Sequence, residues 1–463
     1  MAWKDTLPFF QNVRNFLLIL LSFSTRLSSE EFILENSEIL FENEHESYVS
    51  TLAVSDQYLY LSDVVYAPDD NRPIVAARVA DDGSITGYGP KTRQRIVRLL
   101  LCDPKTGKII HALPGPVSRQ PRISGFGLPL TSPPCFLEDG FAYLTADWHL
   151  KRMRLFEEDG PVEVWNLDIP TETNLTPRLS DDMGYLMPRV TRCGEVLLFT
   201  FNASPKQKRS PFEIQMVAVN LNDGKIRWTR SLGSTGALDR SPTCITNGDE
   251  EFHVITPTGD IHTYTDHGVL LRAFRPSKEF VPENAKKRWS APVWELQRID
   301  DSSLLAFSAE SPEFGESVST PFFRIHVSPD GSMRTIWESS ARRFSVAQAA
   351  IGERLYLRTA YGLMAFSPHD GRILWKHERE ELLINCAWSA PVVHDGFVYF
   401  STHEGLHVFW DDDEYEWAGT FNFKGVKSDF SPPLLHKDYL YSQSSEGFIA
   451  LKLPLFLDQR EED

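Results

Sequence analysis

A unit of four short strands and two Asp-Gly turns recurs along most of this 463-residue chain, and its clearest copy spans residues 363–400. In that copy a strand, the turn Asp370-Gly371 and a strand ending in Trp375 are followed by a polar connection. Another strand, the turn Asp395-Gly396 and a last strand complete it. Asp-Gly between two apolar runs is typical of a β-hairpin. The unit therefore predicts four short antiparallel strands.

Prolines at the start of one strand in each unit give the period of the repeat. They are Pro133, Pro188, Pro242, Pro292, Pro391 and Pro432, with successive spacings of 55, 54, 50, 99 and 41 residues. A period of 40–55 residues, with 99 counted as two units, is typical of propeller blades, which stack in a ring because no blade can bury both of its faces alone. We therefore expect an all-β propeller of four-stranded antiparallel blades.

The number of blades follows from how the chain begins and ends this pattern. We expect eight blades, with seven as the alternative. The eighth copy, from Phe430 on, has only three clear strands before a polar tail, whereas Glu38–Glu42 offers a strand ahead of the first copy. We expect this N-terminal strand to close the ring by pairing with the last blade, which hides a sheet edge. A polar insertion, Asp63–Gln94, interrupts the first copy and is a possible contact surface.

Large side chains stand at one fixed place in several copies. Trp228 and Trp375 lie four residues after their turn glycines, and His111 holds the same place. Because a tryptophan buries about 150–250 Å² of surface, we interpret these side chains as wedges between neighbouring blades and not as a platform for a ligand.

Composition excludes some classes of partner. The net charge of -17 argues against nucleic acid, since binding phosphate needs a basic face. Five cysteines are scattered without a Cys-x-x-Cys pair, so neither a short-spaced zinc knuckle nor a disulfide framework is expected. These are Cys102, Cys135, Cys193, Cys244 and Cys386.

The N-terminus has some features of an export signal. Lys4 and Arg14 precede an eight-residue apolar run, Phe16–Phe23, which is far short of the ~20 residues needed to span a bilayer. Asp5 and Arg26 do not fit the pattern, so a helix lying on the folded domain is the alternative. The expected organisation is a signal peptide-like or apolar segment at 1–29, the propeller at 30–455 and a polar tail at 456–463.

Three turn segments carry a family resemblance. Asp103-x-x-Thr106-Gly107-Lys108, together with residues 220–228 and 367–375, resembles the tryptophan-docking repeat of quinoprotein-like propellers. That family contains the PQQ (pyrroloquinoline quinone) dehydrogenases and non-catalytic relatives, including the lipoprotein scaffold of outer-membrane protein assembly. The resemblance extends over roughly residues 38 to 455. It implies an eight-bladed ring, often exported from the cytoplasm, but not that PQQ is bound.

Two departures from the family bear on function. The dehydrogenases typically carry a disulfide of adjacent cysteines beside the cofactor and are usually longer, whereas this chain has no adjacent pair. No lipid-attachment cysteine follows Phe16–Phe23, so the scaffold lipoprotein is not fully matched either. The resemblance therefore favours the non-catalytic branch.

Two motifs look like chemistry but have a simpler interpretation. His403-Glu404-Gly405-Leu406-His407 matches a zinc pattern that needs a helix, yet it lies between two strands, where Gly405 is expected in a hairpin turn. Asp411-Asp412-Asp413 is interpreted as a solvated turn rather than acid–base machinery. We expect no metal site and name no catalytic residue.

A binding site is predicted at one mouth of the ring. Residues just before each inner strand converge there, and aromatic rings with charges around a concave mouth suit a planar or carbohydrate ligand, or the peptide of a partner. The alternative is that they are ordinary loop residues. These candidates are Arg240, Arg288, Trp289, Trp388, Asp429 and Phe430.

The function expected from these observations is binding, not catalysis. We expect a non-catalytic scaffold, monomeric and without a transmembrane helix or a cofactor. Its compartment would be the cell envelope or the secretory route (the periplasm in a bacterium), with the cytoplasm as the alternative. The alternative function is a PQQ-like oxidoreductase that uses PQQ with Ca²⁺ at the channel mouth.

Overall fold

The structure, a computed structural model, describes most of the repeated region. The described residues are 39–44, 49–66, 76–79, 85–89, 95–113, 115, 117–118, 131–156, 160–175, 177–178, 188–203, 212–235, 242–277, 293–309, 319–342, 344–359, 362–378, 391–402, 405–421, 433–443 and 447–453.

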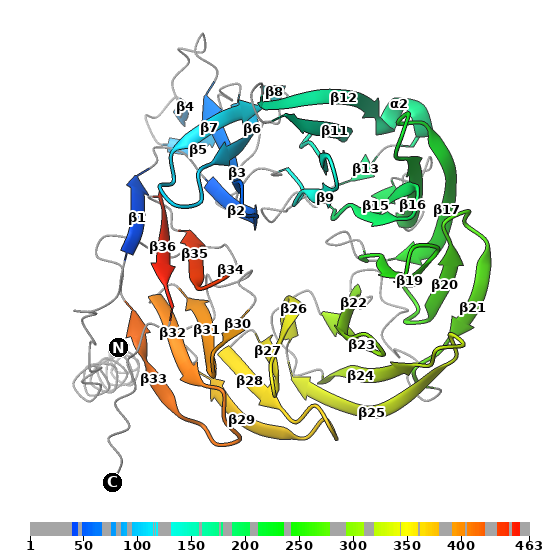
Figure 1. The fold of residues 1–463 in the computed structure, drawn as a ribbon, viewed down its shortest axis with the longest axis vertical. Helices are drawn as coiled ribbons and strands as arrows, with labels where there is room; N and C mark the ends of the chain where they lie inside the picture. The colour runs from blue at the N-terminus through cyan, green and yellow to red at the C-terminus, as the bar shows by residue number, and fades with distance from the viewer. Residues whose placement is uncertain are drawn as a thin grey trace, which may run out of the picture.

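Eight antiparallel sheets stand around a ring, each with one strand near the axis and one at the rim (Figure 1). We number these sheets as blades 1 to 8 and call their four main strands a to d from the axis outward. The prediction of an eight-bladed propeller is confirmed, and the seven-bladed alternative is wrong. Blade order follows chain order, and the copy of the repeat at residues 363–400 supplies the two outer strands of blade 6 and the two inner strands of blade 7.

The first four blades use the chain up to Phe274. Blade 1 is β2 (Val49–Val54), β3 (Leu59–Tyr66), β6 (Arg95–Cys102) and β7 (Ile109–Leu113), with β8 (Val117–Ser118) beside β6. Blade 2 is β9 (Cys135–Leu137), β10 (Gly140–Leu144), β11 (His149–Phe156) and β12 (Gly160–Asp168). Blade 3 is β14 (Thr191–Cys193), β15 (Val196–Ala203), β16 (Phe212–Asn220) and β17 (Ile226–Thr235), with β13 (Pro177–Arg178) also on β15. Blade 4 is β18 (Ile245–Asn247), β19 (Glu251–Ile255), β20 (Ile261–Thr265) and β21 (Leu270–Phe274).

The last four blades complete the ring. Blade 5 is β22 (Val293–Asp300), β23 (Ser303–Ala309), β24 (Ser319–Val327) and β25 (Met333–Arg342). Blade 6 is β26 (Phe344–Ile351), β27 (Leu355–Thr359), β28 (Gly362–Phe366) and β29 (Ile373–Glu378). Blade 7 is β30 (Val392–His394), β31 (Phe397–Thr402), β32 (Gly405–Trp410) and β33 (Trp417–Phe421). Blade 8 is β34 (Leu434–His436), β35 (Tyr439–Gln443), β36 (Gly447–Lys452) and β1 (Ile39–Glu44).

The N-terminal strand closes the ring, as predicted. β1 pairs antiparallel with β36, from Ile39 opposite Leu451 to Glu44 opposite Gly447. Figure 1 shows β1 at the outer edge of blade 8, beside the last strand of the chain. Strands from the two ends of the sequence therefore form one sheet, in which β1 pairs with the edge of β36 that would otherwise be open.

Apolar contacts between blades form the core. Met216, Val217, Ala218 and Val219 are all fully buried, because strand c of blade 3 is covered on both faces by neighbouring blades. The buried apolar residues fall into clusters that each join side chains from two adjacent blades. One cluster, for example, joins blade 3 and blade 4 through Leu198, Met216, Phe252 and Val254. Stability therefore resides in the junctions between blades.

The outer strands share one irregularity. Each strand d carries a bulge in its pairing with strand c, and in blades 1 to 6 the residue after the bulge packs against the turn of the next blade. We call this residue the docking residue. From blade 1 to blade 8 the docking residues are His111, Trp165, Trp228, Arg272, Trp337, Trp375, Gly419 and, by register, Phe41.

The insertion in blade 1 is shorter than the sequence indicated. The prediction that it begins at Asp63 is wrong, because β3 continues to Tyr66 and Asp63 is a buried strand residue opposite Arg98. Beyond Tyr66 the insertion contains a separate hairpin of β4 (Ala76–Val79) and β5 (Ile85–Gly89). One short helix, α2 (Ile169–Thr173), follows blade 2. Within the described residues, no helix is long and apolar enough to cross a membrane.

Candidate functional site: the loop face of the ring

Antiparallel strands place the connections of every blade on two opposite faces. Connections between strands a and b and between c and d lie on one face, which we call the turn face. Connections between b and c, and from d to the next blade, lie on the other, which we call the loop face. Counted between strand bounds, turn-face connections have 2–6 residues, whereas loop-face connections have 1–28.

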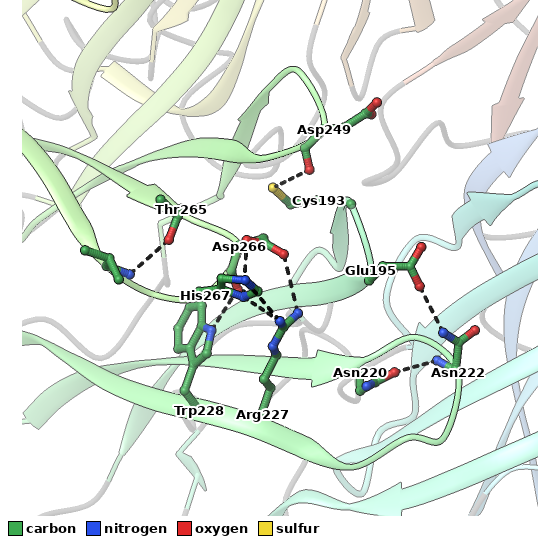
Figure 2. Close-up of polar contacts among 12 residues, drawn as sticks. Cys193, Glu195, Asn220, Asn222, Arg227, Trp228, Asp249, Thr265, Asp266 and His267 are labelled. Atoms are coloured by element: carbon green, nitrogen blue, oxygen red, sulfur yellow. Dashed lines mark hydrogen bonds and ion pairs between the residues drawn. The ribbon is translucent and has the colours of Figure 1, made fainter.

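The turn face is occupied by contacts that hold the blades together. Trp228 of blade 3 donates its indole N–H to the carbonyl oxygen of Asp266 in blade 4, 2.8 Å away (Figure 2). The Trp228 ring lies against Gly268. Gly268 has a φ of +76°, and a Cβ there would lie 2.8 Å from that ring, so only glycine fits. The wedge interpretation of Trp228 is confirmed.

Polar groups around the same junction contact one another or nearby backbone atoms. Arg227 lies beside His267 and is 3.4 Å from an Asp266 carboxylate oxygen, while the Cys193 thiol lies 3.5 Å from the carbonyl oxygen of Asp249 (Figure 2). These contacts join blade 3 to blade 4 at the ends of their turns. They give this cluster a structural role.

Other junctions repeat the contact with different chemistry. Trp337 of blade 5 donates to the carbonyl oxygen of Pro368 over 2.8 Å, and Arg324 donates to the same oxygen over 2.6 Å. Trp375 likewise donates to Asp412 in blade 7 over 3.0 Å. In blade 4 the place is taken by Arg272, which donates to the Asp330 carbonyl oxygen over 2.8 Å. A cationic side chain thus replaces the indole there.

The motif that matches a zinc pattern has a structural role in its described residues. Gly405–Trp410 is strand β32, so the helix that zinc binding would need is not formed. His407 is fully buried, and its Nδ1 lies 2.8 Å from the Thr420 hydroxyl of the neighbouring strand. No three His, Cys, Asp or Glu side chains among the described residues are placed to hold a metal ion.

The cysteines are placed as apolar core residues. Cys102, Cys135, Cys193 and Cys244 lie in blades 1, 2, 3 and 4, each as a free thiol. Burial raises the pKa of the Cys102 and Cys193 thiols to about 12 and that of Cys135 to about 11. Thiols with raised pKa are poor nucleophiles at neutral pH.

The six residues predicted to line the mouth lie outside the described residues. They are Arg240, Arg288, Trp289, Trp388, Asp429 and Phe430. The described chain resumes just after them, at Pro242, Val293, Pro391 and Pro433, immediately before or at an inner strand. That these six residues lie together at one mouth of the ring stays a prediction.

Described residues at the loop-face ends of the strands include groups that the sequence did not single out. Asp63 is completely buried and accepts two hydrogen bonds from Arg98, whose side chain is 30% exposed; the Nε–Oδ1 distance is 3.0 Å. Hydrogen bonding to Asp63 raises the pKa of Arg98. In the next junction the Thr131 backbone N–H donates to the Ser62 hydroxyl over 3.3 Å. Ser62, Asp63 and Thr131 thus form a buried polar layer.

Charges from blades 3 and 5 act on each other near the inner rim. Arg189 precedes the inner strand β14, and the buried Glu295 lies on the inner strand β22. Arg189 is exposed to solvent, yet surrounding protein atoms desolvate it and lower its pKa, an effect that Glu295 opposes. Because water reaches the side chain, the guanidinium stays charged at neutral pH.

A cation also lies at the junction of blades 6 and 7. Arg358, near the end of β27, is 3% exposed, and its guanidinium carbon lies 5.6 Å from the centre of the Phe400 ring. Neither Arg189 nor Arg358 stands in a recognisable motif, so only the repeat alignment could have pointed to them. The loop-face ends of these strands thus combine arginines, carboxylates and hydroxyls.

Two features that would accompany PQQ with Ca²⁺ are not found in the described part of the chain. The four described thiols are in separate blades, so none of them forms the adjacent pair that accompanies the quinone in the dehydrogenases. Nor is any described group of carboxylates placed to hold a metal.

Comparison with known proteins supports the fold. A family described as "Outer membrane protein assembly factor BamB", of the PQQ-like propeller type, matches residues 330–453, which cover the last strand of blade 5, blades 6 and 7, and blade 8 without β1. The crystal structure of BamB from Moraxella catarrhalis is similar with a TM-score of 0.50 and 12% sequence identity, over 87% of this chain and 99% of that one. No curated protein sequence matches. The predicted resemblance to PQQ-like propellers is confirmed.

Proposed function

We propose that this protein is a non-catalytic scaffold that binds a partner protein with its loop face. The observation that carries the proposal is the difference between the two faces of the ring. Turn-face connections have 2–6 residues and bond to the next blade, whereas loop-face connections have 1–28 residues and no common length. Binding residues are commonly found on loops whose length and sequence can vary while a rigid scaffold holds them in place.

The rim of the ring is poorly suited to binding an added strand. All eight outer strands carry a bulge in the same register, and bulges twist an edge so that it no longer pairs evenly. With the turn face occupied by docking contacts, the loop face is the surface with the most freedom to vary. The insertion with hairpin β4–β5 extends from this face.

The residues of the loop face favour a protein as the partner. The candidates Arg240, Arg288, Trp289 and Trp388 belong to the two residue types most enriched at the energetic centres of protein interfaces. Arg189 and Glu295 add charges of both signs near the inner rim. A small planar or carbohydrate ligand would use the same aromatic rings and is an outcome of the test below.

We infer a monomer in the cell envelope or the secretory route. The support is the apolar run Phe16–Phe23 and the match to a family described as an outer membrane protein assembly factor. The whole fold is comparable in extent to the BamB structure, of which 99% is covered.

Site-specific photo-crosslinking in the native host tests the proposal. A photoreactive phenylalanine analogue is placed at Trp289 or Trp388, which we predict to lie on the loop face. The matched control places it at the exposed Lys225 on the turn face. We expect one discrete protein adduct from the loop-face positions and none from Lys225. Adducts formed only from the turn face, or none from either face, would contradict the proposal.

A binding measurement with the captured protein completes the test. The double variant Arg240→Ala and Trp388→Ala should weaken binding at least about tenfold, because hot-spot residues carry most of an interface's energy. Lys105→Ala with Lys225→Ala on the turn face should leave the affinity unchanged. If the purified protein instead shows quinone absorbance, or Ca²⁺-dependent dye reduction with alcohols or sugars, the oxidoreductase alternative is correct.

A further inference from the structure

The junction between blades 7 and 8 lacks the wedge present at earlier junctions. In blades 1 to 6 the docking residue is a large side chain, either aromatic or cationic. In blade 7 the residue at that register is Gly419, opposite Val408. The indole of Trp417, two residues earlier, instead donates to the Gly419 carbonyl oxygen within its own blade, over 2.9 Å. Blade 7 therefore places no docking side chain against blade 8.

The topology of blade 8 explains this difference. Strand d of blade 8 is β1, from the start of the chain, so no turn connects it to strand c. The chain nevertheless enters a turn position at Leu453, whose backbone N–H donates to the Asp438 carbonyl oxygen over 2.6 Å. Leu221 and Asp266, the first turn residues of blades 3 and 4, make the same bond to Glu195 and Glu250. The described chain thus stops at the first residue of an incomplete docking turn.

Apolar surface is partly open at this junction. Leu453 is 5% exposed and packs with Phe397 and Leu440, while Trp410 and Ala418 of blade 7 are only half-buried against the same cluster. The Trp410 and Phe397 rings have centroids 4.3 Å apart.

We propose that residues 454–457, Pro-Leu-Phe-Leu, lie over this junction and cover Trp410 and Ala418 in place of the missing wedge. The segment begins at the junction itself, because it follows Leu453 directly. Three residues span up to about 10 Å, which brings Phe456 within reach of the half-buried surface. The residues that follow, Asp458–Asp463, are all polar or charged and are suited to solvent. This inference does not depend on the proposed function.

Photo-crosslinking of the purified full-length chain tests the location. With the photoreactive phenylalanine analogue at Phe456, we expect intramolecular cross-links to peptides that contain residues 405–421. With the analogue at Gln459 as a control, we expect few or none there. Cross-links that map elsewhere on the ring, cross-links to a second copy, or none at all would overturn the proposal.

A stability measurement tests the contribution of the contact. Leu455→Ser with Phe456→Ser should lower Tm by roughly 2–5 °C and speed amide exchange in β33 and β36 about tenfold, since these strands flank the junction. Exchange in β17 should stay unchanged, as should all exchange in the control Gln459→Ser with Arg460→Ser. Unchanged Tm and exchange in the first variant would contradict the proposal, whatever binds the loop face.

Discussion

The indole N–H of Trp228 lies 2.8 Å from the carbonyl oxygen of Asp266, which belongs to the next blade of the ring. This bond satisfies a backbone acceptor at a turn and directs the ring of Trp228 onto Gly268 and beside Phe252. Equivalent bonds from Trp165, Trp337 and Trp375 show that one arrangement joins successive blades. These docking residues therefore stabilise successive junctions between blades in the same way.

Shortening Trp228 should weaken the junction of blades 3 and 4. We expect Trp228→Ala to lower the free energy of unfolding by about 3–5 kcal/mol, the range for removing a large aromatic side chain from a packed site. Trp228→Phe keeps most of the ring but loses the hydrogen bond, so we expect about 1 kcal/mol. Urea unfolding measures both, with the exposed neighbour Thr229→Ala as the control. A loss below about 0.5 kcal/mol for Trp228→Ala would contradict the wedge role.

Much of this arrangement could be predicted from the sequence. The Asp-Gly turns and the proline spacing predicted the blades, and the position four residues after a turn glycine predicted Trp228, Trp375 and His111. The same rule points to Arg272, four residues after Gly268, but an arginine was not expected as a wedge because it is usually solvated. Its guanidinium fits because it donates to a backbone carbonyl of the next blade.

Other features depend on contacts that no local pattern reveals. Asp63 looked like the start of a polar insertion, because a carboxylate is usually buried only when it has a partner. Its partner, Arg98, lies 35 residues further along the chain, so no local pattern reveals it. The loop-face candidates have no repeat to align, so the sequence predicts their face of the ring but not their mutual geometry. Arg189 and Glu295, from blades 3 and 5, act on each other only because the ring brings non-adjacent blades together.

Asp63 and Arg98 should behave as a coupled pair. Arg98→Leu leaves a buried carboxylate without its partner, and we expect a loss of about 3–5 kcal/mol in the free energy of unfolding. The double variant Asp63→Leu with Arg98→Leu should lose much less, because a buried ion pair can often be replaced by apolar residues. Chemical denaturation of the double-mutant cycle measures the coupling. If the stability losses of the two single variants add up to that of the double variant, the two residues are not coupled. That result would show that Asp63 is solvated, as in a loop.

Phe41 should act as the docking residue of blade 8. It lies opposite Ala450, just after the bulge in β1, in the register that Trp228 holds opposite Ala218. We expect Phe41→Ala to lower Tm by several degrees, and Phe41→Trp to retain the wild-type value. Glu42→Ala, one residue later on the strand, is the matched control. Equal Tm values for Phe41→Ala and the wild type would contradict this assignment.

A phenyl ring cannot donate a hydrogen bond, but at the junction of blades 8 and 1 a tyrosine hydroxyl donates to the turn. The Tyr441 hydroxyl of blade 8 donates to the carbonyl oxygen of Pro104 in the turn of blade 1, over 2.9 Å. We expect Tyr441→Phe to destabilise the protein by about 1 kcal/mol in the Phe41 background and by less when Phe41→Trp supplies an indole donor. Thermal unfolding of the wild type, the two single variants and the double variant measures this coupling.

Acid should destabilise the protein partly through His253. Burial, with help from the charges of Arg298 and Arg272, lowers the pKa of His253 to about 4, and its Nδ1 lies 3.0 Å from the Thr263 hydroxyl. Because the folded pKa is below the unfolded value near 6.5, the unfolded state binds the proton first. Stability due to this group is therefore full above pH 6.5 and falls as the pH decreases from 6.5 to 4, by about 3 kcal/mol at most.

Comparison with His253→Gln isolates that effect. Asp139, Asp260 and Asp330 have lowered pKa values, so their contributions are lost only at more acidic pH. Between pH 6.5 and 4 the variant should therefore show a flatter dependence of unfolding free energy on pH than the wild type. Parallel curves for the two proteins would show that His253 does not titrate differently in the folded state.

Disulfide trapping of β1 on β36 tests the closed eight-bladed ring most directly. Asn43 lies opposite Phe448, so Asn43→Cys with Phe448→Cys should form an intramolecular disulfide on mild oxidation, seen as a mobility shift that a reductant reverses. Asn43→Cys with Ile449→Cys, one residue out of register, should form it far more slowly. Equal trapping of both pairs, trapping only between separate chains, or none would contradict a ring closed by its own N-terminal strand.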